Sequence, residues 1–150
     1  MKRLMLIVII ALTVLFSTSA NARWIHFDNM QVESMGIIAF HYDNAQVKID
    51  KNASTIEFPV LAVLSPKGAQ EVIDTFTKDS TKKIDAKYVI GIHVIDYRAN
   101  KMRTLDSYAT DNYGNKMQDN TDTFPTQWRS CPPDSIPMEW VSKLRKVYNF

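Results

Sequence analysis

Cysteine is nearly absent from this chain of 150 residues, which contains only Cys131. A single cysteine cannot close a disulfide within its own chain. Two interpretations of Cys131 stay open: a partly buried free thiol beside Pro132 and Pro133, or a disulfide that links two copies in a homodimer. Catalysis by cysteine requires a partnered base, and no histidine lies near Cys131 in the sequence.

Glycine is also scarce, with four residues, and the sequence contains no internal repeat and no low-complexity tract. This composition argues against a disordered linker protein. Residues 23–150 have the length of one ordinary globular domain, which is enough to bury a single core. We therefore expect one domain over residues 23–150.

Long hydrophobic runs are missing after the first 22 residues, whereas those residues have the order of a signal peptide. Lys2 and Arg3 precede an apolar run, residues 4–16, and Ala20-Asn21-Ala22 supplies a cleavage pattern. The run of 13 residues is shorter than the roughly 20 that span a membrane. The sequence predicts export to the periplasm or the cell surface with no membrane anchor after cleavage, and an uncleaved anchor is the alternative.

A strong excess of charge is missing as well. The chain has 18 basic and 16 acidic residues, and Lys2 and Arg3 belong to the predicted signal peptide, so the mature domain is close to neutral. The charge therefore does not indicate a nucleic acid partner, because binding to phosphates requires a basic surface.

Catalytic motifs are missing too, since no G-x-S-x-G, no glycine-rich phosphate loop and no dinucleotide fingerprint is present. His26, His41 and His93 form no H-x-x-x-H or H-E-x-x-H pair, and each lies among apolar residues of a predicted strand. We interpret them as structural, with a metal site assembled across strands as the alternative. The sequence predicts no enzyme, no cofactor site and no metal site.

The aspartates are scattered, and most lie in predicted turns, where carboxylates usually cap backbone groups. Residues 111–122 resemble a calcium loop only in composition, because the D-x-D-x-D-G order and the distal glutamate are missing. The candidates for acid–base chemistry are Asp43, Asp106, Asp111, Asp119 and Asp122.

Basic residues form small clusters, which have two interpretations: ordinary solvated surface, or a patch for anionic glycans or host proteins. The clusters are Lys82-Lys83, Lys101 with Arg103, and Lys143, Arg145 and Lys146.

Strand patterns occupy most of residues 23–150. Alternation and β-branched runs predict strands over residues 23–29, 35–42, 46–50, 55–64, 88–97 and 101–109. Asp43-Asn44 predicts a tight turn that joins the second and third strands as a hairpin. Pro59 predicts an edge position or a bulge in the fourth strand, because it removes one ladder donor. Residues 88–97 are apolar on both sides and predict a central strand, followed by a loop over residues 110–122.

Two helices interrupt this pattern. Ser65-Pro66 predicts a helix start, and an apolar stripe follows at the spacing of one helix face. Residues 124–133 predict an irregular segment anchored by Trp128. A C-terminal helix capped by Asp134 or Ser135 follows, and its buried face comprises Ile136, Trp140, Leu144 and either Val147 or Tyr148, with Val141 beside it. The predicted fold class is α+β, an antiparallel β-sheet packed against a C-terminal α-helix with one additional short helix.

Single residues at long intervals give the chain a resemblance to a known family. They are Trp24, Tyr42-Asp43, Pro59, Val63, residues 97–105, Tyr108, Gly114, Trp128, and Pro132 or Pro133 with Ser135. In this order the chain resembles the surface-adhesin protein E-like family of Gram-negative envelope proteins. Members often carry cysteines where this chain has Tyr97 and Val147-Tyr148, so the family-type disulfide is missing here.

The resemblance implies a sheet on a C-terminal helix, export, and in some members dimers that bind host extracellular-matrix or serum proteins. We therefore expect an exported, non-catalytic binding protein of adhesin type whose partner is a protein. The alternative is a periplasmic module for a small ligand or haem, which would use the three histidines and the many aromatic and methionine residues.

Overall fold

A computed structural model describes residues 24–27, 30–76, 85–116 and 124–150. The predicted signal peptide, residues 1–22, lies outside this part of the chain. None of the helices in the described ranges is long and apolar enough to cross a membrane.

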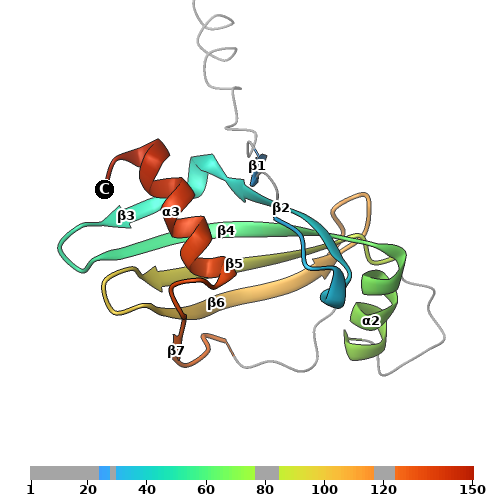
Figure 1. The fold of residues 1–150 in the computed structure, drawn as a ribbon. Helices are drawn as coiled ribbons and strands as arrows, with labels where there is room; N and C mark the ends of the chain where they lie inside the picture. Colours follow the sequence, from blue (N-terminus) through green and yellow to red (C-terminus); the bar gives the residue numbers. More distant parts are fainter. Residues whose placement is uncertain (1–23, 28–29, 77–84, 117–123) are drawn as a thin grey trace, which may run out of the picture.

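Within these residues the architecture is an antiparallel sheet of seven strands with two α-helices, which confirms the predicted α+β class (Figure 1). The strands run in the spatial order β1-β2-β4-β5-β6-β7, and β3 pairs with β4. Two short 3-10 turns, η1 and η2, precede and follow β2. The bounds are β1 Trp24–Phe27, η1 Glu33–Met35, β2 Ile37–Asp43, η2 Asn44–Gln46, β3 Lys48–Asp50, β4 Thr55–Leu64, α2 Pro66–Phe76, β5 Tyr88–Asp96, β6 Lys101–Thr110, β7 Arg129–Ser130 and α3 Ile136–Tyr148.

Both α-helices pack on the same face of the sheet. Successive side chains of a strand point to opposite faces, and Phe58 and Leu64 of β4 therefore share one face. Phe58 contacts the α3 residue Trp140, and Leu64 belongs to the cluster packed against α2. Figure 1 shows α3 crossing β4 and β5, with α2 at the right-hand end of the sheet.

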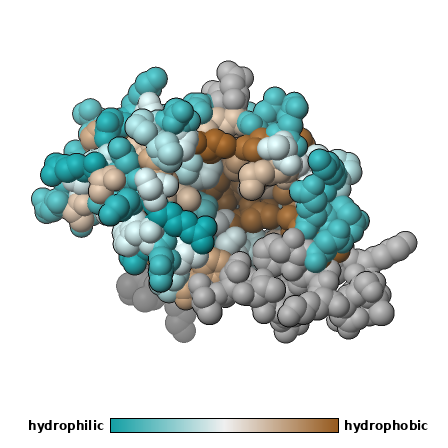
Figure 2. Space-filling model, turned by 60° about the horizontal axis from the view of Figure 1, so that its bottom comes forward, coloured by the Kyte–Doolittle hydropathy of each residue, from teal (hydrophilic) through white to brown (hydrophobic). Residues whose placement is uncertain are grey.

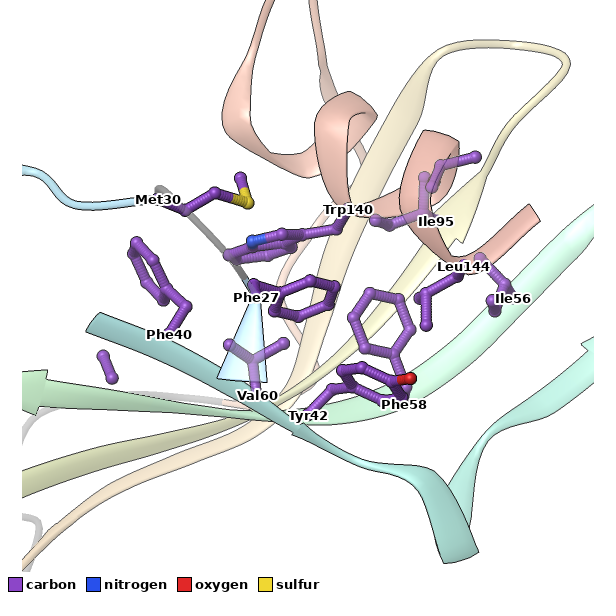
Figure 3. Packing of buried hydrophobic residues seen from close by; sticks show 12 residues of the cluster. Phe27, Met30, Phe40, Tyr42, Ile56, Phe58, Val60, Ile95, Trp140 and Leu144 are labelled. Carbon is purple, nitrogen blue, oxygen red and sulfur yellow. The ribbon is translucent and has the colours of Figure 1, made fainter. Parts of the chain in front are cut away.

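Under α3 lies an aromatic cluster, defined here as Phe27, Phe40, Tyr42, Phe58 and Trp140 (Figure 3). The Trp140 ring lies 5.4 Å from the Phe40 ring and 6.1 Å from the Phe58 ring, both in edge-to-face geometry. It lies 6.0 Å from the Phe27 ring in a stacked arrangement. Such offset and edge contacts are favourable beyond the area they bury. Through these contacts α3 packs against β1, β2 and β4.

The sequence of α3 explains its limits and its buried face. Pro137 lies in the first turn, which tolerates a missing N–H, and Asn149 ends the helix with φ 53° while its N–H bonds to the Arg145 carbonyl. Trp140, Val141 and Leu144 are buried, as predicted. Tyr148, rather than the 63 % exposed Val147, continues this face, and its hydroxyl bonds to the Asn44 carbonyl at 3.3 Å.

The predicted hairpin between the second and third strands is wrong. β2 and β3 both pair with β4, Tyr42 opposite Val60 and Lys48 opposite Glu57, so they follow each other along one edge of β4. The chain reverses only after β3, at the turn formed by residues 51–54.

A carboxylate explains why residues 43–46 do not reverse the chain. Asp43 is fully buried and accepts hydrogen bonds from the Ala45 N–H at 2.9 Å and the Gln46 side-chain amide at 2.6 Å. It caps the single 3-10 turn η2, which displaces the strand locally and lets it continue. The turn-forming residues here interrupt the pairing along one side of β4 and do not reverse the chain.

Pro59 does not lie in an edge strand, because β4 is flanked by β5 on one side and by β2 and β3 on the other. It pairs with Ile92 of β5. On the other side, pairing with β2 stops at Val60 and pairing with β3 resumes at Glu57. The predicted irregularity therefore lies opposite Pro59, in the η2 interruption of the neighbouring edge.

The segment predicted to be irregular contains the two-residue strand β7, which pairs with Lys101 and Met102 of β6. Trp128 just before it is 42 % exposed and does not act as a buried anchor. The Arg103 guanidinium lies 4.9 Å from the centroid of the Trp128 ring, so this tryptophan packs on the surface instead.

Candidate functional site

An apolar groove lies between α2, η1 and the sheet, on the face that also carries α3. Its volume is about 250 Å³. Figure 2 shows the lower side of Figure 1, with strongly hydrophobic residues in a hollow flanked by hydrophilic side chains. The groove is defined by Met35, Ile37, Ala62, Leu64, Gly68, Glu71, Val72 and Val89.

The groove exists because α2 covers its end of the sheet incompletely. Ser65 begins the helix, and its Oγ accepts the Gly68 N–H at 3.2 Å. The stripe of α2 then places Val72 against the apolar ends of β4 and β5. The side chains that α2 packs on these strands are small or aliphatic, and Met35 of η1 stays 62 % exposed. Apolar surface of this kind, open to solvent, is typical of a binding site.

Two glycines hold η1 against α2. A Cβ on Gly68 would overlap the Gly36 carbonyl, and a Cβ on Gly36 would overlap the Gly68 backbone. Gly36 also has a φ of 64°, and its carbonyl accepts the Ser65 N–H at 2.8 Å. This close approach of two backbones keeps Met35 beside α2.

One acidic residue, Glu71, lines the groove. The Glu71 side chain is 52 % exposed and lies 3.8 Å from Lys67 Nζ, a distance at which an exposed ion pair contributes little. Glu33 is exposed in the same 3-10 turn as Met35. The arrangement suits an apolar segment that carries a basic group. Ligand pockets usually occupy roughly 300–1,000 Å³, so this smaller groove suits a few side chains.

The three histidines are divided between the two faces of the sheet. His26 of β1 lies directly opposite His41 of β2, and their rings are 4.9 Å apart on the face away from the helices. His93 lies on the helix face, with its ring 5.7 Å from Trp140 and its Nδ1 3.1 Å from Thr104 Oγ1. No histidine is among the described residues that line the groove. The haem alternative would use all three histidines, which do not come together at one site. It remains a prediction.

Burial lowers the pKa of two of these rings. It lowers the pKa of His93 to about 4, so this ring is neutral at physiological pH. Burial also lowers the pKa of His41, and the charge of His26 adds to this shift. Within the described ranges, no three histidine, cysteine or carboxylate side chains come together to hold a metal ion.

The candidate aspartates act mainly as caps where they are described. Asp43 caps η2, and Asp111 accepts hydrogen bonds from the Asn115 side chain and from the backbone N–H groups of Asn115 and Tyr113, which lower its pKa. The Asp106 carboxylate lies 3.9 Å from Lys116 Nζ, and both side chains are about half exposed. Asp119 and Asp122 lie outside the described residues. The described members of this set do not form a shared acid–base site.

Cys131 is buried, with 5 % of its surface exposed, and burial raises its pKa. Its N–H donates to the Asn100 carbonyl at 2.7 Å, which fixes it beside the turn between β5 and β6. These observations fit the free-thiol interpretation. A disulfide to a second copy stays a prediction and would require the thiol to become accessible.

Three described members of the basic clusters have local packing or charge partners. Arg103 packs on Trp128, Lys143 lies 3.7 Å from the Glu139 carboxylate, and Arg145 lies over the Tyr97 and Phe150 rings at 5.3 and 5.5 Å. Lys82-Lys83 lies outside the described residues. Surface packing accounts for these contacts.

Sequence reasoning missed the groove, since it assigned Met35 and Ile37 to a strand and Val72 to a core stripe. The available signal is the pair of glycines, Gly36 and Gly68, in a chain with four. No protein-family model matches the sequence, and no curated protein matches it.

Proposed function

We propose that this chain is an exported, non-catalytic cell-envelope protein that binds an apolar segment of a protein partner in the groove beside α2. The observation that carries the proposal is the open apolar surface of that groove, with Met35 62 % exposed at one side. The signal-peptide pattern of residues 1–22 supports export. The family resemblance supports the adhesin form, in which the partner is a host matrix or serum protein.

The chemistry of the groove defines the partner segment. Aliphatic side chains would displace water from Ile37, Leu64 and Val72, which is favourable in proportion to the apolar area buried. A lysine or arginine beside them would face Glu71. Contacts between such exposed charges are screened by salt, so binding should weaken as ionic strength rises.

Binding of laminin and vitronectin to the protein recovered after export, measured by surface plasmon resonance over a salt series, tests the adhesin form. We expect saturable, salt-sensitive binding in the wild type and its loss in Met35→Glu, because a carboxylate would enter the apolar surface. Val147→Glu is the matched control, since Val147 is 63 % exposed on α3 and does not line the groove. Absence of saturable binding, or equal losses in both variants, would contradict the proposal.

Protease treatment of intact cells separates the two predicted locations. Removal of the protein by added protease would show that it is displayed at the surface. Protection until the outer membrane is opened would place it in the periplasm, where the partner would be another envelope protein.

A further inference from the structure

A second feature, independent of the groove, is the pair of histidines on the sheet face away from the helices. His26 and His41 occupy directly opposite positions of the antiparallel pair β1 and β2. Side chains at such positions start from Cβ atoms about 4.5–5.5 Å apart and point to the same side of the sheet. Their neighbours Phe27 and Phe40 are buried on the helix face, so register directs both imidazoles outward together.

The geometry of the two rings fits a shared ligand. Their centroids are 4.9 Å apart and their planes are inclined by 50°, so they are not stacked face to face. Two nitrogens in adjacent coordination positions of one ion, at about 2.0–2.1 Å each, lie about 3 Å apart. The exposed His26 side chain already has a contact of its own, so the shared site requires it to exchange that contact for the ion.

One atom of the pair lacks a partner. Nδ1 of His41 is buried and forms no hydrogen bond in the described part of the protein. A buried ring nitrogen without a partner is costly and requires an explanation. A cation bound by His41 through this nitrogen would supply the missing partner, whereas Thr104 already supplies one for His93.

We propose that His26 and His41 form a two-imidazole site for a divalent first-row transition metal ion, with copper(II) bound most tightly. Imidazole suits copper, nickel and zinc, and the usual order of affinities places copper(II) above the other divalent ions of the row. Two histidines leave the remaining coordination positions to water. Calcium and magnesium prefer oxygen ligands and are not expected to bind.

Calorimetric titration with copper(II), in the presence of glycine as a competing chelator, tests the site in the protein recovered after export of the complete chain. We expect one copper ion per chain and a signature of two imidazole nitrogens in the paramagnetic resonance spectrum. His26→Asn and His41→Asn should each weaken binding by roughly tenfold or more, since each removes a direct ligand. Magnesium should produce no heat of binding.

The alternative copper sites give different results. A site formed by the chain's amino terminus and His26 would survive His41→Asn, and a site on His93 would survive the double substitution; either outcome overturns the proposal. His41 is partly buried, so its substitution could unfold the protein. Proton NMR of the wild type then decides: substoichiometric copper(II) should broaden the His26 and His41 ring signals together, and broadening that spares His41 overturns the pair.

Discussion

The two helices on one face of the sheet cover it in different ways. α3 brings Trp140 into contact with three phenylalanine rings, and its buried residues Val141 and Leu144 are exposed by 2 % or less. α2 covers Leu64 and Val89 with smaller side chains and leaves a groove of about 250 Å³ beside Met35. The same sheet therefore has a filled region under α3 and an open region beside α2.

The open region beside α2 is where this fold has room for a ligand. Interiors are close-packed, and a change of one methylene in the filled region is felt throughout its contacts. The region beside α2 can exchange water for a partner without breaking those contacts. We therefore expect truncation of a side chain under α3 to cost more stability than truncation of a side chain that lines the groove.

Trp140→Ala should produce the largest loss. The ring is 5 % exposed and contacts Phe27, Phe40 and Phe58, so its removal leaves a cavity under α3. We expect a decrease of about 3–5 kcal/mol in the free energy of unfolding, measured by urea denaturation. Val147→Ala on the exposed side of α3 is the control and should change it by less than about 0.5 kcal/mol. An unchanged midpoint for Trp140→Ala would show that α3 is not docked as described.

Acid should weaken the filled region through His93. Its pKa is about 4 in the folded protein and 6.5 in the unfolded chain, so between these values only the unfolded chain binds the proton. His93 therefore leaves the free energy of unfolding unchanged above pH 6.5, lowers it as the pH decreases from 6.5 to 4, and causes no further change below pH 4. The total decrease is about 3 kcal/mol.

The His93 contribution is obtained by comparing wild type with His93→Gln in urea denaturation from pH 7.5 to 4. The variant should lose less stability than wild type over this range, and His26→Gln at the exposed site should follow wild type more closely. Parallel curves for wild type and His93→Gln would contradict the assignment. Carboxylates titrate in both proteins and cancel in the difference.

Gly68→Ala tests the contact that positions α2 beside η1. Helix propensity alone predicts a gain of roughly 1 kcal/mol for alanine in place of glycine. The new Cβ would overlap the Gly36 backbone, which cannot rotate away as a side chain could. We expect a net loss of about 1–3 kcal/mol, as in other overpacked sites. Gln70→Gly on the exposed side of α2 is the control for helix propensity and should cost roughly 1 kcal/mol. A Gly68→Ala variant that is more stable than wild type would contradict the close contact between Gly68 and Gly36.

The sequence predicted those features that depend on local patterns. Alternation identified β4 and β5, the Ser65-Pro66 pair identified the start of α2, and the spacing of Trp140 and Leu144 identified the buried face of α3. Each of these signals is complete within about ten residues. The α+β class followed from them.

Features that depend on distant partners were missed. Asp43-Asn44 has the composition of a reversal, but β4 offers pairing to both β2 and β3, and the chain continues along it. β7 has two residues and therefore no periodicity to detect. The opposition of His26 and His41 depends on strand register, and the groove depends on Gly36 meeting Gly68, which no local pattern encodes.

The smallest expected effect is the difference in stability loss between the same substitution, valine to alanine, made in α3 and in α2. Val141 of α3 is 2 % exposed, whereas Val72 of α2 lines the open groove. Val141→Ala removes fully buried methyl groups and leaves a cavity, while Val72→Ala removes groups that water already reaches. Both gain the same helix propensity, so this term cancels in the comparison. Urea denaturation should show a loss larger by about 1 kcal/mol for Val141→Ala, and equal losses would mean that the region beside α2 is packed as tightly as the region under α3.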